Sequence, residues 1–300
     1  MMIVSTNTSK MPKKPCFTGF FVSAQAILGR PVAEDALILG ISGRYEFKNK
    51  GIDVFIDAMG QLNRNNGLGK EVLAFILVPA GHAGANKELL HNLELPYQAV
   101  TSTDLYLTHY LNDSANDPVM NRIRAQKLRN SEEDKVKIFF VPSYLNGDDG
   151  VFNMPYYDLL VGMDLTAFPS YYEPWGYTPL ESLAFKVPTI TTTLAGFGLW
   201  VKEHYNMNHP GIEVIHREDG DASNVATAIA EWVKNYTQVG ETEMQKDRDN
   251  AKDVSRIALW DNLINYYKQA YTIALNQVSV RLKRPLLWNG SRSKGSRSGA

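Results

Sequence analysis

Short apolar runs alternate with amphipathic stretches along most of the chain. The apolar runs, which are rich in β-branched residues, predict strands at 36–42, 72–78, 135–141, 165–168, 189–193 and 212–216. After the first run, apolar residues recur at helical spacing, at Ile52, Phe55, Ile56, Met59 and Leu62. Uninterrupted apolar strands that alternate with helices are typical of a parallel sheet covered on both faces. The pattern therefore predicts an α/β fold with a doubly wound, mostly parallel sheet of six strands.

The stretches between these strands predict further elements. Helices are expected in the later part of 81–94, at 118–129, at 156–162 and from residue 178 onward. Residues 97–100 are expected to form one more short strand.

Two helices are expected to close the domain. The first covers 222–236, with Val225, Ile229, Trp232 and Val233 facing inward. The second is a longer amphipathic helix across 244–275.

Composition divides the chain into three parts. Residues 36–278 carry the alternating pattern and are expected to form one domain with C-terminal helices. Residues 1–35 precede the first strand and are expected to be a poorly ordered leader or linker. The basic tail at 279–300 contains little besides Gly, Ser, Arg and Lys after Trp288, so we expect it to be disordered.

The bulk composition narrows the class of protein. The formal net charge is −1, so we expect no nucleic-acid or membrane partner that binds through bulk charge. Cys16 is the single cysteine, which excludes an internal disulfide. No run approaches the ~18 apolar residues that span a membrane, and the first residues lack the apolar core of a signal peptide. These features predict a cytoplasmic protein.

The loop after the first strand carries candidate anion-binding chemistry. Ligands of doubly wound sheets bind beyond the carboxyl ends of the strands, where SGRYEFKNKG (42–51) lies. Arg44 and Lys50 stand there beside a helix start, whose free N–H groups favour anions, and together they could hold a diphosphate. A solvated loop with two surface cations is the alternative. The motif is neither G-x-G-x-x-G nor a P-loop.

The loop after the fourth strand combines carboxylates with large aromatics. It reads FPSYYEPWGYTPLE (168–181) and contains Glu173 and Trp175 close to a predicted helix start. Flat apolar rings and a carboxylate suit a sugar, which presents both ring faces and hydroxyls. Thr178 as the N-cap and Glu181 as its partner would form a capping box, which explains Glu181 without a ligand. The capping and ligand-binding roles of Glu181 are compatible.

These two segments, together with TITTTLAGFG (189–198), resemble the signature segments of the animal and fungal glycogen synthase family. The resemblance extends from about residue 38 to 275. Members of that family are retaining glucosyltransferases of GT-B architecture, with two Rossmann-like domains and catalysis in the cleft between them. The resemblance implies that this chain corresponds to the C-terminal, nucleotide-sugar-binding domain. Residues 1–35 cannot supply the N-terminal domain, so we expect this chain alone to be inactive.

The family pattern assigns catalytic roles to three residues. It implies that Arg44 and Lys50 hold the donor diphosphate and neutralise the leaving group. Glu173 matches the first carboxylate of the family's E-x7-E pair, near the donor glucose. We interpret Glu173 as an orienting and electrostatic group, not as a nucleophile.

The same resemblance assigns substrate-binding residues. Glu181, the second carboxylate of the pair, is expected to contact the ribose. Gly176, Tyr177 and Thr178 are expected to meet the phosphates. Tyr144 and Leu145 are expected to flank the base, on which Tyr156 would stack.

No cofactor or metal is expected, because the six histidines are scattered and Asp148-Asp149 is more typical of a solvated turn. The donor would be UDP-glucose or ADP-glucose, which the residues do not distinguish, and the acceptor glycogen or another α-1,4-glucan. A homo-oligomer is possible by analogy with the family. One alternative is a nucleotide-sugar-binding module without turnover. Another is a related transferase with a different donor, against which the YYEPWGY block argues.

One departure from the family concerns regulation. The animal and fungal enzymes carry an arginine cluster near the C-terminal end that binds an activating sugar phosphate. The matching stretch here, 241–256, contains only Arg248 and Arg256 among interleaved acidic residues. We therefore predict that this protein lacks activation by a sugar phosphate.

Overall fold

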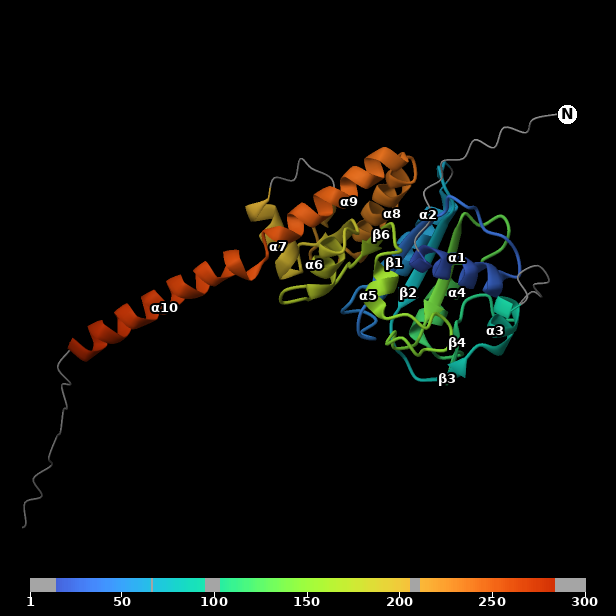
Figure 1. Cartoon of the computed structure of the whole chain (residues 1–300), viewed down its shortest axis with the longest axis horizontal. Coiled ribbons are helices and arrows are strands. Elements are labelled where there is room, and N and C mark those ends of the chain that lie inside the picture. Colours follow the sequence, from blue (N-terminus) through green and yellow to red (C-terminus); the bar gives the residue numbers. More distant parts are fainter. Residues whose placement is uncertain (1–14, 66, 95–102, 206–210, 284–300) are drawn as a thin grey trace, which may run out of the picture. The chain divides into compact units, whose positions relative to one another are not determined.

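The computed structural model describes residues 15–65, 67–94, 103–205 and 211–283. It divides into two compact units, 1–257 and 258–300, which we treat separately. Figure 1 shows the elements in sequence colours. The division at 257 falls inside the segment that we expected to be a single domain, 36–278.

The first unit is built on a six-stranded sheet in which every neighbouring pair is parallel. Its strands are β1 (Leu37–Ser42), β2 (Val72–Leu77), β5 (Val136–Val141), β6 (Leu165–Ala167), β7 (Thr189–Thr192) and β8 (Ile212–Ile215). Their spatial order is β5-β2-β1-β6-β7-β8, the doubly wound Rossmann order. The predicted fold class and all six predicted main-sheet strands are confirmed.

Helices connect these strands and cover the sheet. In the first unit they are α1 (Pro15–Leu28), α2 (Ile52–Arg64), α3 (Lys87–Glu94), α4 (Pro118–Ala125), α5 (Tyr156–Leu160), α6 (Tyr177–Ala184), α7 (Gly196–His204), α8 (Ala222–Tyr236) and α9 (Glu241–Arg256). Helices α2 and α8 pack side by side (Figure 1). Helix α6 packs against α9.

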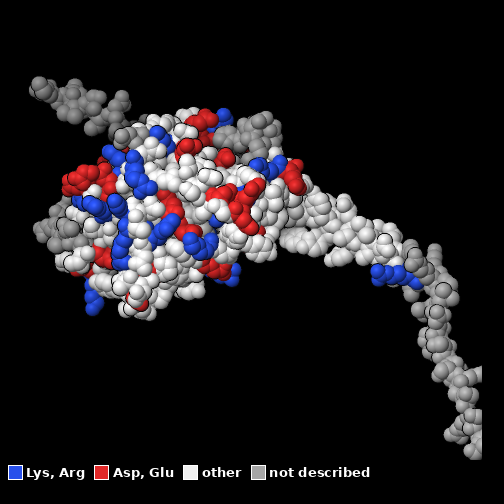
Figure 2. Space-filling model, turned by 180° about the vertical axis from the view of Figure 1, so that it is seen from behind, with Lys and Arg blue, Asp and Glu red and all other residues white. Residues whose placement is uncertain are grey.

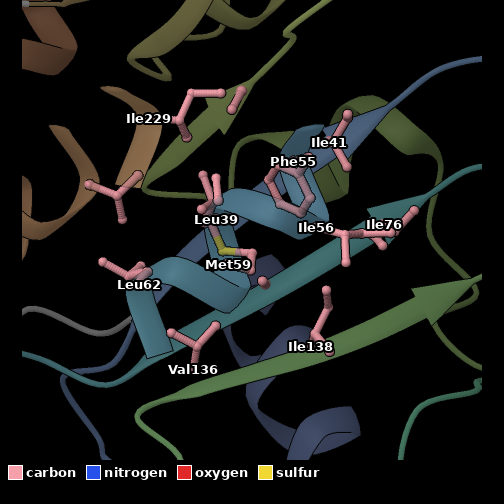
Figure 3. Packing of buried hydrophobic residues seen from close by; sticks show 14 of the residues in the cluster. Leu39, Ile41, Phe55, Ile56, Met59, Leu62, Ile76, Val136, Ile138 and Ile229 are labelled. Carbon is pink, nitrogen blue, oxygen red and sulfur yellow. The ribbon is translucent and has the colours of Figure 1, made fainter. Parts of the chain in front are cut away.

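One face of the sheet carries the larger core. Leu39 and Ile41 of β1 point toward α2, whose Phe55 and Met59 are fully buried (Figure 3). Each large apolar side chain buried in this way stabilises the fold by about 1.5–3 kcal/mol. Ile38, which precedes Leu39, belongs to the core on the opposite face. Burial on both faces explains why the strands are apolar without alternation.

Helix α1 contributes to that opposite core. Phe20 is fully buried, with its ring centroid 4.6 Å from that of Phe75 on β2 and 5.6 Å from that of Phe152. The expectation of a poorly ordered leader at 1–35 is therefore wrong for the part that α1 covers. A helix that precedes the first strand lies outside the strand–helix alternation, so the pattern gave no reason to attach it to the sheet.

Two further elements differ from the sequence prediction. Strand β3 (His82–Ala85) pairs antiparallel with β4 (His109–Leu111), and neither strand was predicted. Their partner residues lie far apart in sequence, so the pairing leaves no local periodicity. The proposed strand at 97–100 lies outside the described residues.

The helix predicted across 244–275 is interrupted. It corresponds to α9 and, in the second unit, α10 (Trp260–Lys283). Residues 257–259 are apolar, so the sequence shows no break. Helix α10 extends to residue 283, five residues into the segment that we expected to be a disordered tail. The remainder of that tail is outside the described residues.

The surface carries charges of both signs. Figure 2 shows Lys and Arg side chains beside Asp and Glu side chains on the visible face. None of the helices in the described residues is both long and apolar enough to cross a membrane.

Candidate functional site

At the centre of the sheet, the direction in which successive strands are added reverses. Strands β1 and β6 are neighbours, with Leu39 opposite Leu165. From β1 the chain proceeds outward to β2 and β5, and from β6 it proceeds outward in the other direction to β7 and β8. The loops that follow β1 and β6 therefore separate at a topological switch point, where such sheets bind ligands. Both predicted motifs lie in these loops.

Gly51 lies where the loop after β1 packs directly against the loop after β6. It adopts a left-handed conformation, with φ +68°, at the N-cap of α2. A Cβ at this position would lie 1.7 Å from the carbonyl oxygen of Pro169. The N–H of Tyr171 also donates to the carbonyl of Asn49 at 2.8 Å. Only glycine permits both the backbone conformation and this close approach.

Lys50 and Glu173 meet where these loops touch. The Lys50 ammonium forms an ion pair with the Glu173 carboxylate, and the two side chains are 13% and 20% exposed. The backbone N–H of Gly196 donates to the carbonyl of Glu173 at 3.0 Å. Gly196 belongs to the third segment of the family resemblance, 189–198. The structure thus brings all three segments together around one ion pair.

Helix α6 begins beside this ion pair. Gly176 is its N-cap, with φ +111°, and no side chain caps the first turn. A Cβ on Gly176 would contact Cγ of Glu173 at 3.6 Å and the Pro179 ring at 3.3 Å. The free N–H groups of the first turn and the positive end of the helix dipole therefore lie next to Glu173 and Lys50.

The predicted capping box is wrong. Thr178 is inside α6 and does not cap it, because left-handed Gly176 allows the helix to begin earlier than predicted. The Glu181 carboxylate instead accepts a hydrogen bond from the Tyr157 hydroxyl at 3.0 Å. The Tyr157 ring stacks on Phe185 at 5.1 Å. Glu181 is thus held by an aromatic side chain of α5.

A cleft of about 240 Å³ opens between the ends of β1, β2 and β5 and the start of α6. We call it the donor cleft, after the donor-binding role expected from the sequence for several of its residues. It is lined by Ser42, Gly43, Leu77, Pro79, Ser143, Tyr144, Leu145, Tyr156 and Thr178. It brings together four residues predicted to bind substrate: Tyr144, Leu145, Tyr156 and Thr178.

Two tyrosines of the donor cleft differ in exposure and in hydrogen bonding. The Tyr156 hydroxyl is 2.7 Å from the Ser42 hydroxyl, which fixes the ring against β1. Burial raises the pKa of Tyr156 to about 12, so its hydroxyl stays protonated at neutral pH. Tyr144 is 75% exposed. The cleft therefore has one buried, hydrogen-bonded aromatic side chain and one that is largely exposed.

Arg44 does not join the ion pair of Lys50. Its side chain is 79% exposed, and the guanidinium pairs with Glu46 at 2.9 Å. It follows Gly43, which lines the donor cleft. Tyr177 is also largely exposed, at the first residue of α6.

Arg217 is a site residue that the sequence analysis missed. It follows β8, is 6% exposed, and its guanidinium donates to the carbonyl of Pro169, the group against which Gly51 packs. It also lies 5.5 Å from the centre of the Tyr171 ring. Burial lowers the pKa of Arg217, and the nearby carboxylates of Asp53 and Asp221 offset this lowering only in part. Its position at a strand's carboxyl end was the available signal.

Among the described residues, no group of three or more His, Cys, Asp or Glu side chains is arranged to hold a metal ion.

Two solved structures show partial similarity to this chain. WaaG, a glycosyltransferase involved in lipopolysaccharide biosynthesis, aligns with a TM-score of 0.43 and 15% identity over 82% of this chain and 48% of that one. Sucrose-phosphate synthase from Thermosynechococcus elongatus aligns with a TM-score of 0.42 and 18% identity over 87% of this chain and 51% of that one.

Curated relatives are more informative. Glycogen [starch] synthase isoform 2 of Saccharomyces cerevisiae is 28% identical over 81% of this chain and 44% of its own length. The Neurospora crassa glycogen [starch] synthase is 28% identical over 86% and 44%, and the rat liver enzyme 27% identical over 81% and 42%. This chain spans less than half the length of these relatives. The family model for glycogen synthase matches residues 32–102 and 92–284. The chain therefore belongs to the glycogen synthase family.

Proposed function

We propose that this chain is the donor-binding part of a glycogen synthase. In this proposal it binds a nucleoside-diphosphate glucose, UDP-glucose or ADP-glucose. The glucose is then transferred, with retention of anomeric configuration, to the non-reducing end of an α-1,4-glucan such as glycogen. Residues outside this chain complete the catalytic cleft.

The observation that carries the proposal is the meeting of Lys50, Glu173 and the uncapped start of α6 beside the donor cleft. As the bond between the anomeric carbon and the diphosphate oxygen breaks, negative charge grows on the diphosphate and positive charge on the anomeric carbon. A fixed ammonium and free helix N–H groups stabilise the first, and a carboxylate stabilises the second. Because these groups are already in position before the reaction, no free energy is needed to reorient them as charge develops.

The other predicted residues have roles in the same proposal. Arg44, which is exposed, can turn from Glu46 onto the diphosphate. The backbone of Gly176, Tyr177 and Thr178 meets the phosphates. Glu181 holds the ribose.

The nucleoside end of the donor would lie deeper in the cleft. Tyr144, Leu145 and Tyr156 surround the base, with the fixed ring of Tyr156 as the stacking surface.

A second reading is a nucleotide-sugar-binding module without turnover of its own. Both readings share the donor cleft. In both readings the protein is cytoplasmic, as expected from the sequence, and a homo-oligomer is proposed by analogy with the family. The two readings differ in whether the chain, given UDP-glucose or ADP-glucose and an oligosaccharide, lengthens the acceptor.

Calorimetric titration of the 300-residue chain with UDP and ADP tests donor binding. We expect Lys50→Ala to raise the Kd at least ~10-fold, because it removes a charge-assisted contact to the diphosphate. Arg44→Ala and Glu181→Ala should also weaken binding. Lys48→Ala is the matched control, because Lys48 lies on the same loop but pairs with Asp53 at 2.7 Å.

If neither nucleotide binds, or if Lys50→Ala and Lys48→Ala have equal effects, the donor proposal is wrong. Acceptor elongation by this chain alone would contradict the view that transfer needs residues outside it.

A further inference from the structure

A second pocket adjoins the donor cleft at the same edge of the sheet. It has a volume of about 300 Å³ and is lined by Tyr45, Ala80, Gly81, Leu111, Asn112, Asp113, Asn116 and Asp117. The two pockets share no lining residue, but both use the turns that follow β1 and β2. Gly43 and Pro79 line the donor cleft, and Tyr45 and Ala80 line the second pocket.

The lining of the second pocket combines apolar residues with hydrogen-bonding side chains. Ala80, Gly81 and Leu111 supply apolar surface. The remaining residues supply carboxylates, side-chain amides and a phenol. Carboxylates accept hydrogen bonds, and amides both donate and accept them. A ligand that combines apolar C–H faces with many hydroxyls would satisfy both kinds of surface.

Part of this lining is held rigidly. Asp117 is 9% exposed and caps α4, accepting a hydrogen bond from the Met120 N–H at 3.0 Å. Its second carboxylate oxygen accepts from the Tyr45 hydroxyl. Burial, followed by the hydrogen bond and charge of Asp117, raises the pKa of Tyr45, so its hydroxyl remains protonated. Tyr45 and Asp117 therefore form a preorganised wall.

The opposite rim is tied to the turn after β2. The backbone N–H of Asn112 donates to the carbonyl of Gly81 at 3.1 Å. The side-chain amide of Asn116 donates to Asp113 at 2.9 Å. Asn112 and Asp113 are exposed, so their side chains are accessible to a ligand.

The charge of the lining excludes other ligand classes. Hydrogen bonds from Asn116 lower the pKa of Asp113, so it is ionised at neutral pH and repels phosphates and carboxylates. A tightly bound metal would need more carboxylate or histidine ligands, and the described residues contain no such group. A neutral polyhydroxylated ligand fits best.

We propose that this second pocket is a subsite for one sugar unit of an α-1,4-glucan, held beside the donor cleft. The identity of the sugar rests on the proposed function. The polar wall, the apolar floor and the adjoining donor cleft carry the assignment. A chain bound here lies next to the donor without occupying the nucleotide's place.

The test uses maltoheptaose as the probe and the 300-residue chain in calorimetric titrations. We expect the double variant N112A/D113A to raise the Kd for maltoheptaose at least ~10-fold, because it removes hydrogen bonds to hydroxyls. Its Kd for UDP should stay within about twofold of the parent, because no residue of the donor cleft changes. Asn121→Ala, on the solvent side of α4, is the matched control and should leave both constants unchanged.

Gly81→Ala provides a second variant that acts by shape. A Cβ at this position would lie 3.0 Å from the side-chain amide nitrogen of Asn112, which lines the pocket, and would crowd that side chain. We expect weaker maltoheptaose binding and unchanged UDP binding. A thermal melt of each variant checks that the fold is retained.

The outcomes separate the two proposals. Maltoheptaose binding that N112A/D113A leaves unchanged, or UDP binding with no maltoheptaose binding, overturns the subsite and leaves the donor proposal intact. Loss of both ligands in N112A/D113A with an intact fold overturns the independence of the two pockets and hence the subsite. Calcium binding that N112A/D113A abolishes, without maltoheptaose binding, also overturns it. Maltoheptaose binding that depends on Asn112 and Asp113, in a chain that binds neither UDP nor ADP, supports the subsite and overturns the donor proposal.

Discussion

At the scale of single residues, backbone conformation decides whether the two motif loops can close on each other. Gly51 is left-handed and lies directly against the Pro169 carbonyl. Lys50 precedes it, so the position of the ammonium relative to Glu173 depends on that contact. One glycine thereby couples the geometry of the ion pair to the local fold.

Replacing Gly51 with Ala should destabilise the protein by about 3 kcal/mol and abolish nucleotide binding, because left-handed strain adds to a backbone clash. Chemical denaturation and UDP titration measure the two effects. Gly84→Ala is the matched control, because Gly84 has φ +105° but no atom within 4 Å of an added Cβ. It should cost only about 1–2 kcal/mol. Equal costs would show that the Pro169 contact is unimportant.

Arg217 contacts Pro169 and Tyr171, and we expect it to act as a positioning residue through them. Arg217→Ala should weaken UDP binding by roughly 5- to 10-fold, because the loop that carries Glu173 loses a charged hydrogen bond. Arg217→Lys can still donate to the Pro169 carbonyl and should restore much of the affinity at equal or lower stability. A purely structural role would make UDP affinity follow stability in both variants.

At the scale of elements, α9 contains the two arginines of the segment that we compared with the family's arginine cluster. The Arg248 guanidinium donates to the carbonyl of Met163 at 2.8 Å and to Asp164 at 2.9 Å. Arg256 pairs with Asp253 within the helix. Both arginines of the segment therefore contact carbonyls or carboxylates. The lack of activation by a sugar phosphate stays a prediction.

A sugar phosphate should therefore leave UDP affinity unchanged. Coupling between an effector site and a ligand site typically changes affinity about 5-fold or more. The measurement is a UDP titration at increasing glucose 6-phosphate, with inorganic phosphate as the control for a general anion effect. A several-fold shift specific to the sugar phosphate would contradict the prediction.

Helix α9 also carries a buried acid. Burial raises the pKa of Asp247 to about 6, against about 4 in an unfolded chain. Ionisation of Asp247 therefore destabilises the fold. The penalty is absent below pH 4, grows between pH 4 and 6, and is complete above pH 6. Asp247→Asn should add about 1–2 kcal/mol at pH 7 and little at pH 4, as measured by urea denaturation. A pH-independent gain would exclude this explanation.

At the scale of the whole molecule, α1 completes the first unit. Its apolar side chains cover the sheet face opposite α2 and α8. This unit therefore needs residues before its first strand to close its core.

Phe20→Ala should cost about 3–4 kcal/mol, because it removes a fully buried ring that packs on Phe75. Val22→Ala is the control on the same helix, because Val22 is 40% exposed, and it should cost less than about 0.5–1 kcal/mol. Thermal or urea unfolding measures both. A small loss for Phe20→Ala would mean that α1 is only loosely attached.

The apolar pattern of the sequence was enough to predict the sheet and its strands, and it named the two loops in which we expected the candidate site. Strands buried on both faces must be apolar throughout, and parallel strands need helical crossovers, so periodicity suffices to predict them. Loops at the carboxyl ends of such strands then meet at one edge of the sheet. Lys50 and Glu173 lie in two of these loops, so the sequence identified both as candidate site residues. Family segments sharpened the roles assigned to these residues.

Tertiary structure alone decided the features that depend on contacts between distant residues. Local periodicity does not encode contacts between distant parts of the chain, such as the β3–β4 pairing, the docking of α1 and the link from Arg217 to Pro169. Nor does it encode the left-handed backbone of Gly176, which lets α6 begin early. The physical reason is that such contacts are chosen by packing and by closure of loops in three dimensions. A pattern of residue types along the chain constrains which surfaces are apolar, but not which of them meet.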